Sequence, residues 1–188
     1  MNRFLHMGGL LLLVAVACSS EPTSGERAKV VAVVDGDTFK VNLATGEVAT
    51  VRLLGVDAPD FGGERDLSDC NESAKADYCQ RWRKVWEKYH STPTLDIPLI
   101  RGCYDEGLAV LRNLLEGRNV TLIEDDTVGS DPYGRLLRYM EDEQGDDVSR
   151  MLVETGRAIV FGPCKRCDEL SKIEGSRALA HEGCLWAE

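Results

Sequence analysis

Residues 29–54 read KVVAVVDGDTFKVNLATGEVATVRLL, and this stretch decides the fold class. It holds three runs of apolar and β-branched residues, separated by Asp35-Gly36 and by Ala44-Thr45-Gly46. β-branched residues favour strands, and Asp-Gly between two such runs is a strong short-range signal for a β-hairpin. The pattern predicts three consecutive strands, at 29–34, 38–41 and 48–54.

The rest of the chain alternates helical and strand patterns. Leucines recur at helical spacing over 104–116, and Gly117 then ends the helix. Further helices are predicted at 148–154 and 168–181, and further strands at 120–123, 136–140 and 158–161. Short strands with helices between them favour an α+β domain containing a small barrel over a parallel sheet.

The chain has 188 residues and a formal net charge of −10. The length suits one domain with its own hydrophobic core. Nucleic-acid binding depends on Lys and Arg that neutralise phosphates, so the acidic balance counts against binding by the surface as a whole. A local cationic patch or a bound divalent cation is then required.

The first residues predict export. A short apolar run at 8–16 ends in Ala15-Val16-Ala17-Cys18, and it is shorter than the roughly 20 residues that span a bilayer. We interpret residues 1–17 as a signal peptide. The cut resembles a bacterial lipobox, in which Cys18 is lipidated and residues 18–28 form a tether to the membrane. A plain secretory cleavage and a buried N-terminal helix are the alternatives.

The expected location is therefore the cell envelope, at the outer membrane or facing the periplasm, or else the medium.

Six cysteines follow Cys18, and an even number in an exported chain predicts up to three disulfides. We expect one bridge to hold residues 61–102, through Cys70, Cys79 or Cys103, and another to fix the C-terminal helix through Cys184. The CKRC stretch at 164–167 favours a structural disulfide, with a redox pair or half of a zinc site as alternatives.

Residues 61–102 interrupt the regular pattern. An aromatic stripe at helical spacing lies there beside basic residues, and it consists of Tyr78, Trp82, Val85, Trp86 and Tyr89. Such a stripe is typical of a buried helix face. Aromatic and basic side chains together can also stack bases and bind phosphates, so both interpretations stay open.

Three short stretches carry candidate chemistry: VDGDTF at 34–39, RLLGVDAPD at 52–60 and DPYGR at 131–135. Each supplies charged residues beside a predicted turn or strand end. Taken singly, each is explained equally well by surface salt bridges and turn carboxylates.

Together these residues match the needs of phosphodiester hydrolysis. Carboxylates such as Asp37 and Asp57 are hard oxygen ligands that suit calcium. Arg52 and Arg135 can clamp phosphate oxygens with bidentate hydrogen bonds. A further carboxylate, Asp60, can orient or deprotonate the attacking water.

The order DGDT, RLLGVDAPD, leucine-rich helix and DPYGR resembles that of the staphylococcal nuclease (thermonuclease) family. Residues 148–156 are similar to that family's second helix, and residues 171–186 to its last helix and terminal tryptophan. The resemblance implies an α+β fold with a five-stranded OB-type barrel and about three helices. It assigns residues 29–188 to this domain, with 61–102 as an inserted helical loop.

The resemblance also implies roles for single residues. It implies that Asp37, Asp57 and the Ala58 carbonyl bind Ca²⁺. It implies that Arg52 and Arg135 bind the scissile phosphate, and that Tyr133 contacts a phosphate nearby. It implies a monomer that cleaves DNA or RNA by in-line attack of water. Two positions depart from the family: Asp60 replaces a glutamate, and FGP at 161–163 lacks a second stacking tyrosine.

The competing function is a binding module of the cell envelope, a nuclease-like barrel with weak or no activity that holds nucleic acid or a protein. The shorter Asp60 and the net charge of −10 favour it. Both metal carboxylates and both arginines favour the enzyme. A structural lipoprotein is a third reading, based only on the signal segment.

Overall fold

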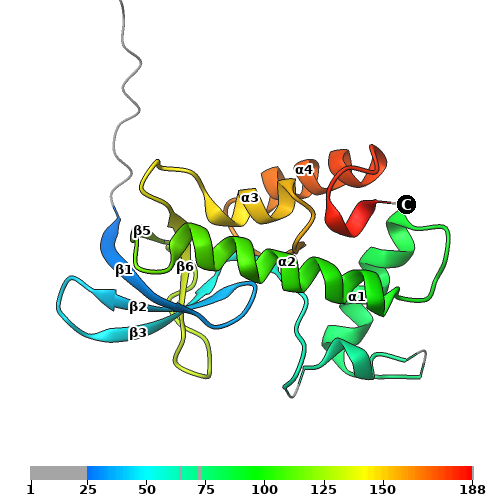
Figure 1. Ribbon diagram of the computed structural model, residues 1–188, viewed down its shortest axis with the longest axis horizontal. Helices are drawn as coiled ribbons and strands as arrows, with labels where there is room; N and C mark the ends of the chain where they lie inside the picture. Colours follow the sequence, from blue (N-terminus) through cyan, green and yellow to red (C-terminus); the bar gives the residue numbers. More distant parts are fainter. Residues whose placement is uncertain (1–24, 64, 72, 188) are drawn as a thin grey trace, which may run out of the picture.

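Residues 25–63, 65–71 and 73–187 are described in a computed structural model. Their centre is a closed barrel of five strands in the order β1-β2-β3-β6-β5 (Figure 1). The strands are β1 Glu26–Val33, β2 Thr38–Leu43, β3 Val48–Leu53, β5 Asn119–Glu124 and β6 Leu136–Glu141. All neighbours are antiparallel except β3 and β6, which are parallel. The predicted α+β fold with an OB-type barrel is confirmed.

The first two strands meet at the predicted Asp-Gly turn, where the Val34 N–H donates to the Thr38 carbonyl at 2.9 Å. The third strand ends at Leu53 because Gly55, with φ +82°, turns the chain into β4 Gly55–Asp57. A side chain at Gly55 would also meet Leu170 at 2.7 Å. The short β4 pairs with β7 Ile159–Phe161 outside the barrel.

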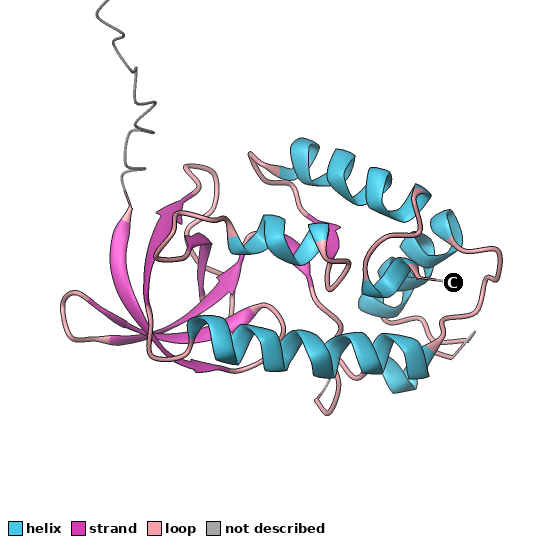
Figure 2. Ribbon diagram, turned by 45° about the horizontal axis from the view of Figure 1, so that its top comes forward, coloured by secondary structure: helices cyan, strands magenta, loops and turns pink. Residues whose placement is uncertain are grey.

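The described residues contain four α-helices: α1 Asp77–Tyr89, α2 Ile97–Leu115, α3 Val148–Glu154 and α4 Cys167–Leu179. Helices α2, α3 and α4 contact strands. Two single 3₁₀ turns are η1 Leu67–Asp69 and η2 Cys184–Trp186. The barrel lies at one end of the molecule, α1 and the C-terminus lie at the other, and α2 runs between them (Figures 1 and 2).

The longest helix begins earlier than the leucine pattern predicts. It starts at Ile97 rather than at 104, and so takes up part of the predicted 61–102 insert. The reason is local: the Asp96 carboxylate caps the Leu99 N–H at 3.0 Å, and Pro98 occupies the first turn. The predicted 148–154 helix has the predicted bounds.

The barrel core contains fully buried side chains from alternate strand positions, including Val30, Phe39, Val51 and Met140. Leu111 and Leu115 of α2 join this cluster. Alternation buries one side of each strand, which is how a small barrel fills its interior.

A second core forms between α1, α2 and the C-terminus. Trp82 and Trp86 are each 3% exposed and pack in one cluster with Trp186. The packing interpretation of the aromatic stripe is therefore correct for these two tryptophans.

Two disulfides cross-link this second core, as expected for the 61–102 insert and for Cys184. Cys70 pairs with Cys79 inside the insert, and Cys103 of α2 pairs with Cys184 near the C-terminus. The third pair, Cys164 with Cys167, closes the turn before α4, as the structural interpretation of CKRC predicted.

The predicted signal peptide (1–17) and the lipidation residue Cys18 lie outside the described residues. The described chain is already in β1 at Glu26, so residues 26–28 belong to the barrel and not to the predicted 18–28 tether. Between residues 25 and 187, no described helix is both long and apolar enough to cross a bilayer.

Candidate active site

The predicted site residues converge at one edge of the barrel. A single small pocket is lined by six of them: Asp37, Arg52, Asp57, Ala58, Asp60 and Arg135. Strand pairing explains the convergence, because Thr38 is opposite Arg52 and the parallel pairing sets Leu136 opposite Val51. This pairing brings together Asp37 before β2, Arg52 of β3 and Arg135 before β6.

Arg52 links the two predicted metal carboxylates. Its Nη2 forms an ion pair with Asp37 Oδ2 at 2.9 Å and donates to Asp57 Oδ1 at 2.8 Å. Its Nη1 donates to the carbonyls of Leu53 and Val56 at 2.9 and 2.8 Å. Buried charges are tolerated when they are paired and hydrogen-bonded. Arg52 therefore holds the strand end in shape as well as lining the pocket.

Asp37, like Asp57, is a buried carboxylate of the pocket. Its Oδ2 also accepts the Ala58 N–H at 2.7 Å, and its Oδ1 accepts the Thr38 hydroxyl at 3.2 Å. Burial raises the pKa of Asp37 to about 8, although Arg52 opposes the shift. A buried carboxylate of this kind gains from a nearby cation, because the cation stabilises its charged form.

Asp57 is surrounded by guanidinium groups. Besides Arg52, it accepts a hydrogen bond on Oδ2 from Arg81 Nε at 2.9 Å, and Arg65 Nη2 lies 3.6 Å from Oδ1. Arg65 and Arg81 both belong to the insert. The sequence did not single them out as site residues, although Arg81 is one of the basic residues beside the aromatic stripe.

The donor set fits a hard divalent cation by its chemistry. Four aspartates and three arginines line the pocket, so carboxylates are in excess. Calcium accepts carboxylate, carbonyl and water oxygens in flexible geometry. Among the described residues, no group of three or more His, Cys, Asp or Glu is placed to hold a metal ion. Asp37 and Asp57 would hold a calcium ion only together with carbonyls, such as that of Ala58, and water, since Arg52 Nη2 already lies 2.9 and 2.8 Å from the two carboxylates.

Asp60 differs from its neighbours in having an unengaged carboxylate. Within the described part of the chain, its side chain makes no hydrogen bond or ion pair. Burial raises its pKa above the ordinary value of 3.8, and Asp35 adds to the shift. A carboxylate with a raised pKa at the wall of a pocket is suited to accept a proton. Glu64, a further carboxylate four positions along the chain, lies outside the described residues.

The DPYGR turn is built around Asp131, whose role sequence reasoning missed. Its Oδ1 accepts the N–H groups of Tyr133 and Arg135 at 2.9 Å each. Its Oδ2 accepts Arg135 Nε at 2.6 Å. Gly134 has φ +79°, which the tight turn requires. Asp131 thus orients Arg135, and the spacing of Asp four residues before Arg was a signal for it.

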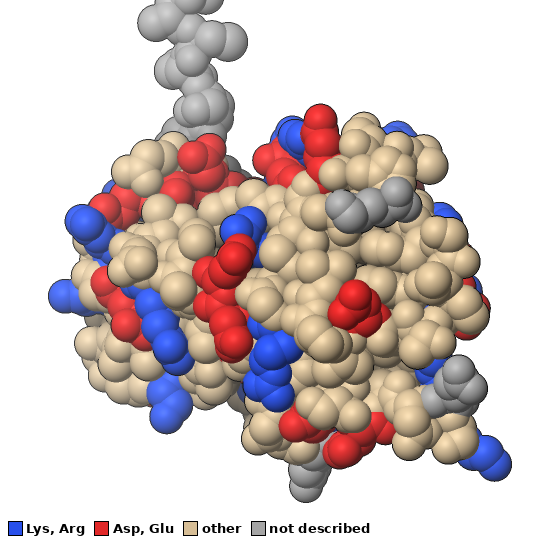
Figure 3. Space-filling view, turned by 45° about the vertical axis from the view of Figure 1, so that its right-hand side comes forward, with Lys and Arg blue, Asp and Glu red and all other residues tan. Residues whose placement is uncertain are grey.

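Tyr133 is not in the same pocket. It is 84% exposed and lines an adjoining hollow, together with Asp60 and Arg135. Acidic and basic side chains are interspersed over the face drawn in Figure 3 rather than gathered by sign. A phosphate on this face would therefore meet single arginines and not an extended basic patch.

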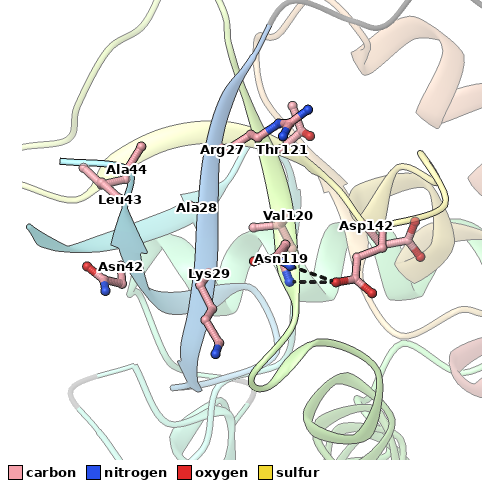
Figure 4. Close-up of a pocket in the computed structure, with 11 residues that line it drawn as sticks. Arg27, Ala28, Lys29, Asn42, Leu43, Ala44, Asn119, Val120, Thr121 and Asp142 are labelled. Atoms are coloured by element: carbon pink, nitrogen blue, oxygen red, sulfur yellow. Dashed lines mark hydrogen bonds between the residues drawn. The ribbon is translucent and has the colours of Figure 1, made fainter. Parts of the chain in front are cut away.

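A larger hollow of about 590 Å³ lies elsewhere, against β1, β2 and β5. Figure 4 shows its wall, where Asn119 donates to the Glu143 carboxylate at 3.2 Å through both its main-chain and side-chain nitrogens. Arg27 and Lys29 line it opposite Asp142 and Glu143. These opposite charges balance, and none of the predicted site residues lies there.

Comparison with known proteins adds no identification: no family model matches the chain, and no curated protein is significantly similar to it. Membership of the staphylococcal nuclease family therefore stays a prediction from the order of the motifs.

Proposed function

We propose that this protein is a calcium-dependent phosphodiesterase that hydrolyses DNA or RNA, of the staphylococcal nuclease type. One observation carries the proposal: Arg52, Arg135 and the unengaged Asp60 line the same pocket as the Asp37–Asp57 pair. Guanidinium groups for phosphate oxygens, a proton acceptor and a cation site are together what this hydrolysis needs.

In the proposed reaction Arg135, held by Asp131, binds a non-bridging phosphate oxygen. Arg52 faces the same phosphate from the barrel side and neutralises charge that develops on it. Asp60 accepts a proton from the attacking water. The water oxygen bonds to phosphorus as the bond between phosphorus and the leaving oxygen breaks. The leaving oxygen is then protonated from solvent. Calcium, when bound, supplies positive charge beside the reacting phosphate.

The competing function is a binding module, and one specific observation favours it. Arg52 uses both terminal nitrogens within the protein, and Arg81 already occupies Asp57 Oδ2. A site closed in this way has fewer donors for the charge that develops on a reacting phosphate, which weakens catalysis more than binding at the adjoining arginines. The two functions differ in one measurable outcome, which is bond cleavage.

The test is hydrolysis of single-stranded DNA and of RNA by the purified chain, in calcium and then in excess chelator. Cleavage in calcium that stops on chelation, and returns on adding calcium back, supports the enzyme. Binding without cleavage under all conditions supports the binding module instead.

Export to the cell envelope belongs to the same proposal. Three disulfides are typical of oxidising compartments, which agrees with the predicted signal peptide. Mass spectrometry of the mature N-terminus tests the anchor: an acylated Cys18 supports it, and an unmodified terminus in the medium indicates plain secretion.

A further inference from the structure

We propose that helix α1 completes a second subsite, which binds the phosphate and base of a nucleotide next to the one being cleaved. The proposal rests on the nuclease function above and names the substrate more closely. The preferred substrate is then a strand with at least two consecutive phosphates, not an isolated phosphodiester.

The subsite is the hollow that adjoins the hydrolytic pocket. It has a volume of about 570 Å³ and is lined by Asp60, Arg65, Asp77, Tyr78, Arg81, Tyr133 and Arg135. Asp60, Arg65, Tyr78 and Arg135 also line the hydrolytic pocket, so the two spaces are continuous. A strand with one phosphate between Arg52 and Arg135 would therefore extend past α1.

The charge of this hollow is opposite to that of the chain. Three arginines and two aspartates line it, whereas the whole protein carries −10. A local excess of guanidinium groups on an acidic protein is the arrangement that phosphate binding requires.

Arg81 is the central group. Its Nε is bonded to Asp57 and its guanidinium lies 4.0 Å from the centre of the Phe161 ring. Within the described residues, its two terminal nitrogens donate to no protein group. Arg81 is thus held in place from two sides while four N–H donors stay available for a phosphate.

Two tyrosines supply surfaces on which a base can stack. Tyr133 is 84% exposed, with the Arg135 guanidinium 5.7 Å from its ring centre. Tyr78 also lines the hollow, and its hydroxyl donates to the Asp66 carbonyl at 3.2 Å. Aromatic rings beside cationic groups bind single strands with little sequence preference.

The helix is fixed before any substrate arrives. Trp82, next to Arg81, is buried in the second core, and Cys79 is bridged to Cys70. A preorganised wall binds more tightly because no entropy is lost in ordering it. Helix α1 therefore has two sides with different roles. Trp82 and Trp86 pack in the second core, whereas Tyr78 and Arg81 line the hollow.

The test compares two substrates that differ by one nucleotide, TpT with one phosphate and TpTpT with two, for wild type and Arg81→Ala. We expect Arg81→Ala to lower the ratio of kcat/KM for TpTpT to kcat/KM for TpT roughly tenfold, the scale of one hydrogen bond to a charged group. The ratio is the readout because loss of the bond to Asp57 acts on both substrates alike. Lys84→Ala is the control, because Lys84 is exposed on the same helix and lines neither pocket.

Salt dependence adds a second readout. The slope of log affinity against log salt for a single-stranded oligonucleotide should become shallower by about 0.7 in Arg81→Ala, as for one lost phosphate contact. Arg65→Ala should act in the same direction, and Arg65 is 42% exposed, so this variant serves if Arg81→Ala does not fold. A role limited to neutralising Asp57 would lower activity on TpT and TpTpT equally, and that result overturns the subsite.

Binding of labelled (dT)₄ in EDTA separates the two proposals, since it does not need turnover. If wild type cleaves nothing but Arg81→Ala or Arg65→Ala binds (dT)₄ more weakly, the subsite stands and the hydrolytic function fails. If wild type cleaves and neither variant alters length dependence or binding, the hydrolytic function stands and the subsite is wrong.

Discussion

The guanidinium of Arg52 donates to the carboxylate of Asp57 at 2.8 Å, and both side chains are buried. The pair joins a residue proposed to bind phosphate to one proposed to bind calcium. Structural and functional effects therefore overlap at Arg52, and experiments must separate them by comparison with Arg135.

Arg135→Ala should lower kcat by about 10²–10³ while stability changes little, because its turn is partly exposed and loses only the pair with Asp131. Arg52→Ala should lose activity and also about 3–5 kcal/mol of unfolding free energy, since it leaves buried Asp37 without its cationic partner and Asp57 with Arg81 but without Arg52. Urea denaturation and DNA hydrolysis, measured on the same preparations, check both. Equal hydrolysis by wild type and a folded Arg135→Ala would contradict the proposed site.

Asp60→Asn should lower kcat by about 10²–10⁴ if Asp60 accepts the proton from water. In the wild type, activity should fall as the pH drops through the raised pKa of Asp60, because the acceptor must be ionised. Asp60→Glu keeps a carboxylate and should retain far more activity than Asp60→Asn. The pH–rate profiles of the three proteins are the measurement, and an unchanged acid limb in Asp60→Asn would rule out this role.

Removal of calcium should stop hydrolysis without unfolding the protein. Arg52 and Arg81 already neutralise Asp37 and Asp57 within the fold, so the empty site carries no bare pair of carboxylates. Calcium should raise the thermal midpoint as a bound ligand does, and Asp37→Asn should weaken that rise. Circular dichroism melts with EDTA and with a calcium series check this, and collapse of the fold in EDTA would contradict it.

Asp125 should make stability depend on pH in acid. The Thr127 hydroxyl, together with the N–H groups of Lys165 and Thr127 and the Tyr139 hydroxyl, holds its pKa well below the ordinary 3.8. Its stabilisation is therefore present above about pH 4 and lost as the pH falls below that value. Urea midpoints between pH 5 and 2.5 should fall less in Asp125→Asn than in wild type. Asp126→Asn, on an exposed neighbour, is the control and should behave as wild type.

The disulfides should differ in their effect on stability. Loop-closure entropy gives about 4.5 kcal/mol for Cys103–Cys184, which are 81 positions apart, against about 2 kcal/mol for Cys164–Cys167, which are three apart. Serine replacement of each pair, followed by urea denaturation, measures the difference. A larger loss from the shorter bridge would show that native-state packing outweighs the entropy of the unfolded chain.

The sequence alone determined the features that depend on neighbours along the chain. The Asp35-Gly36 hairpin, the strands of the barrel and the helix at 148–154 follow from turn residues and apolar spacing, which act over a few residues. The even number of cysteines predicted up to three bridges, but 15 pairings of the six were possible and only the fold chose among them.

The tertiary structure decided which charges meet. No local pattern states that Arg81 of α1 bonds to Asp57, 24 positions earlier, or that Arg52 bridges Asp37 and Asp57. These contacts arise because the β3–β6 pairing and the second core bring distant segments to one edge of the barrel. Spacing along the chain specifies secondary structure, whereas the partners of a long charged side chain depend on how the finished elements pack.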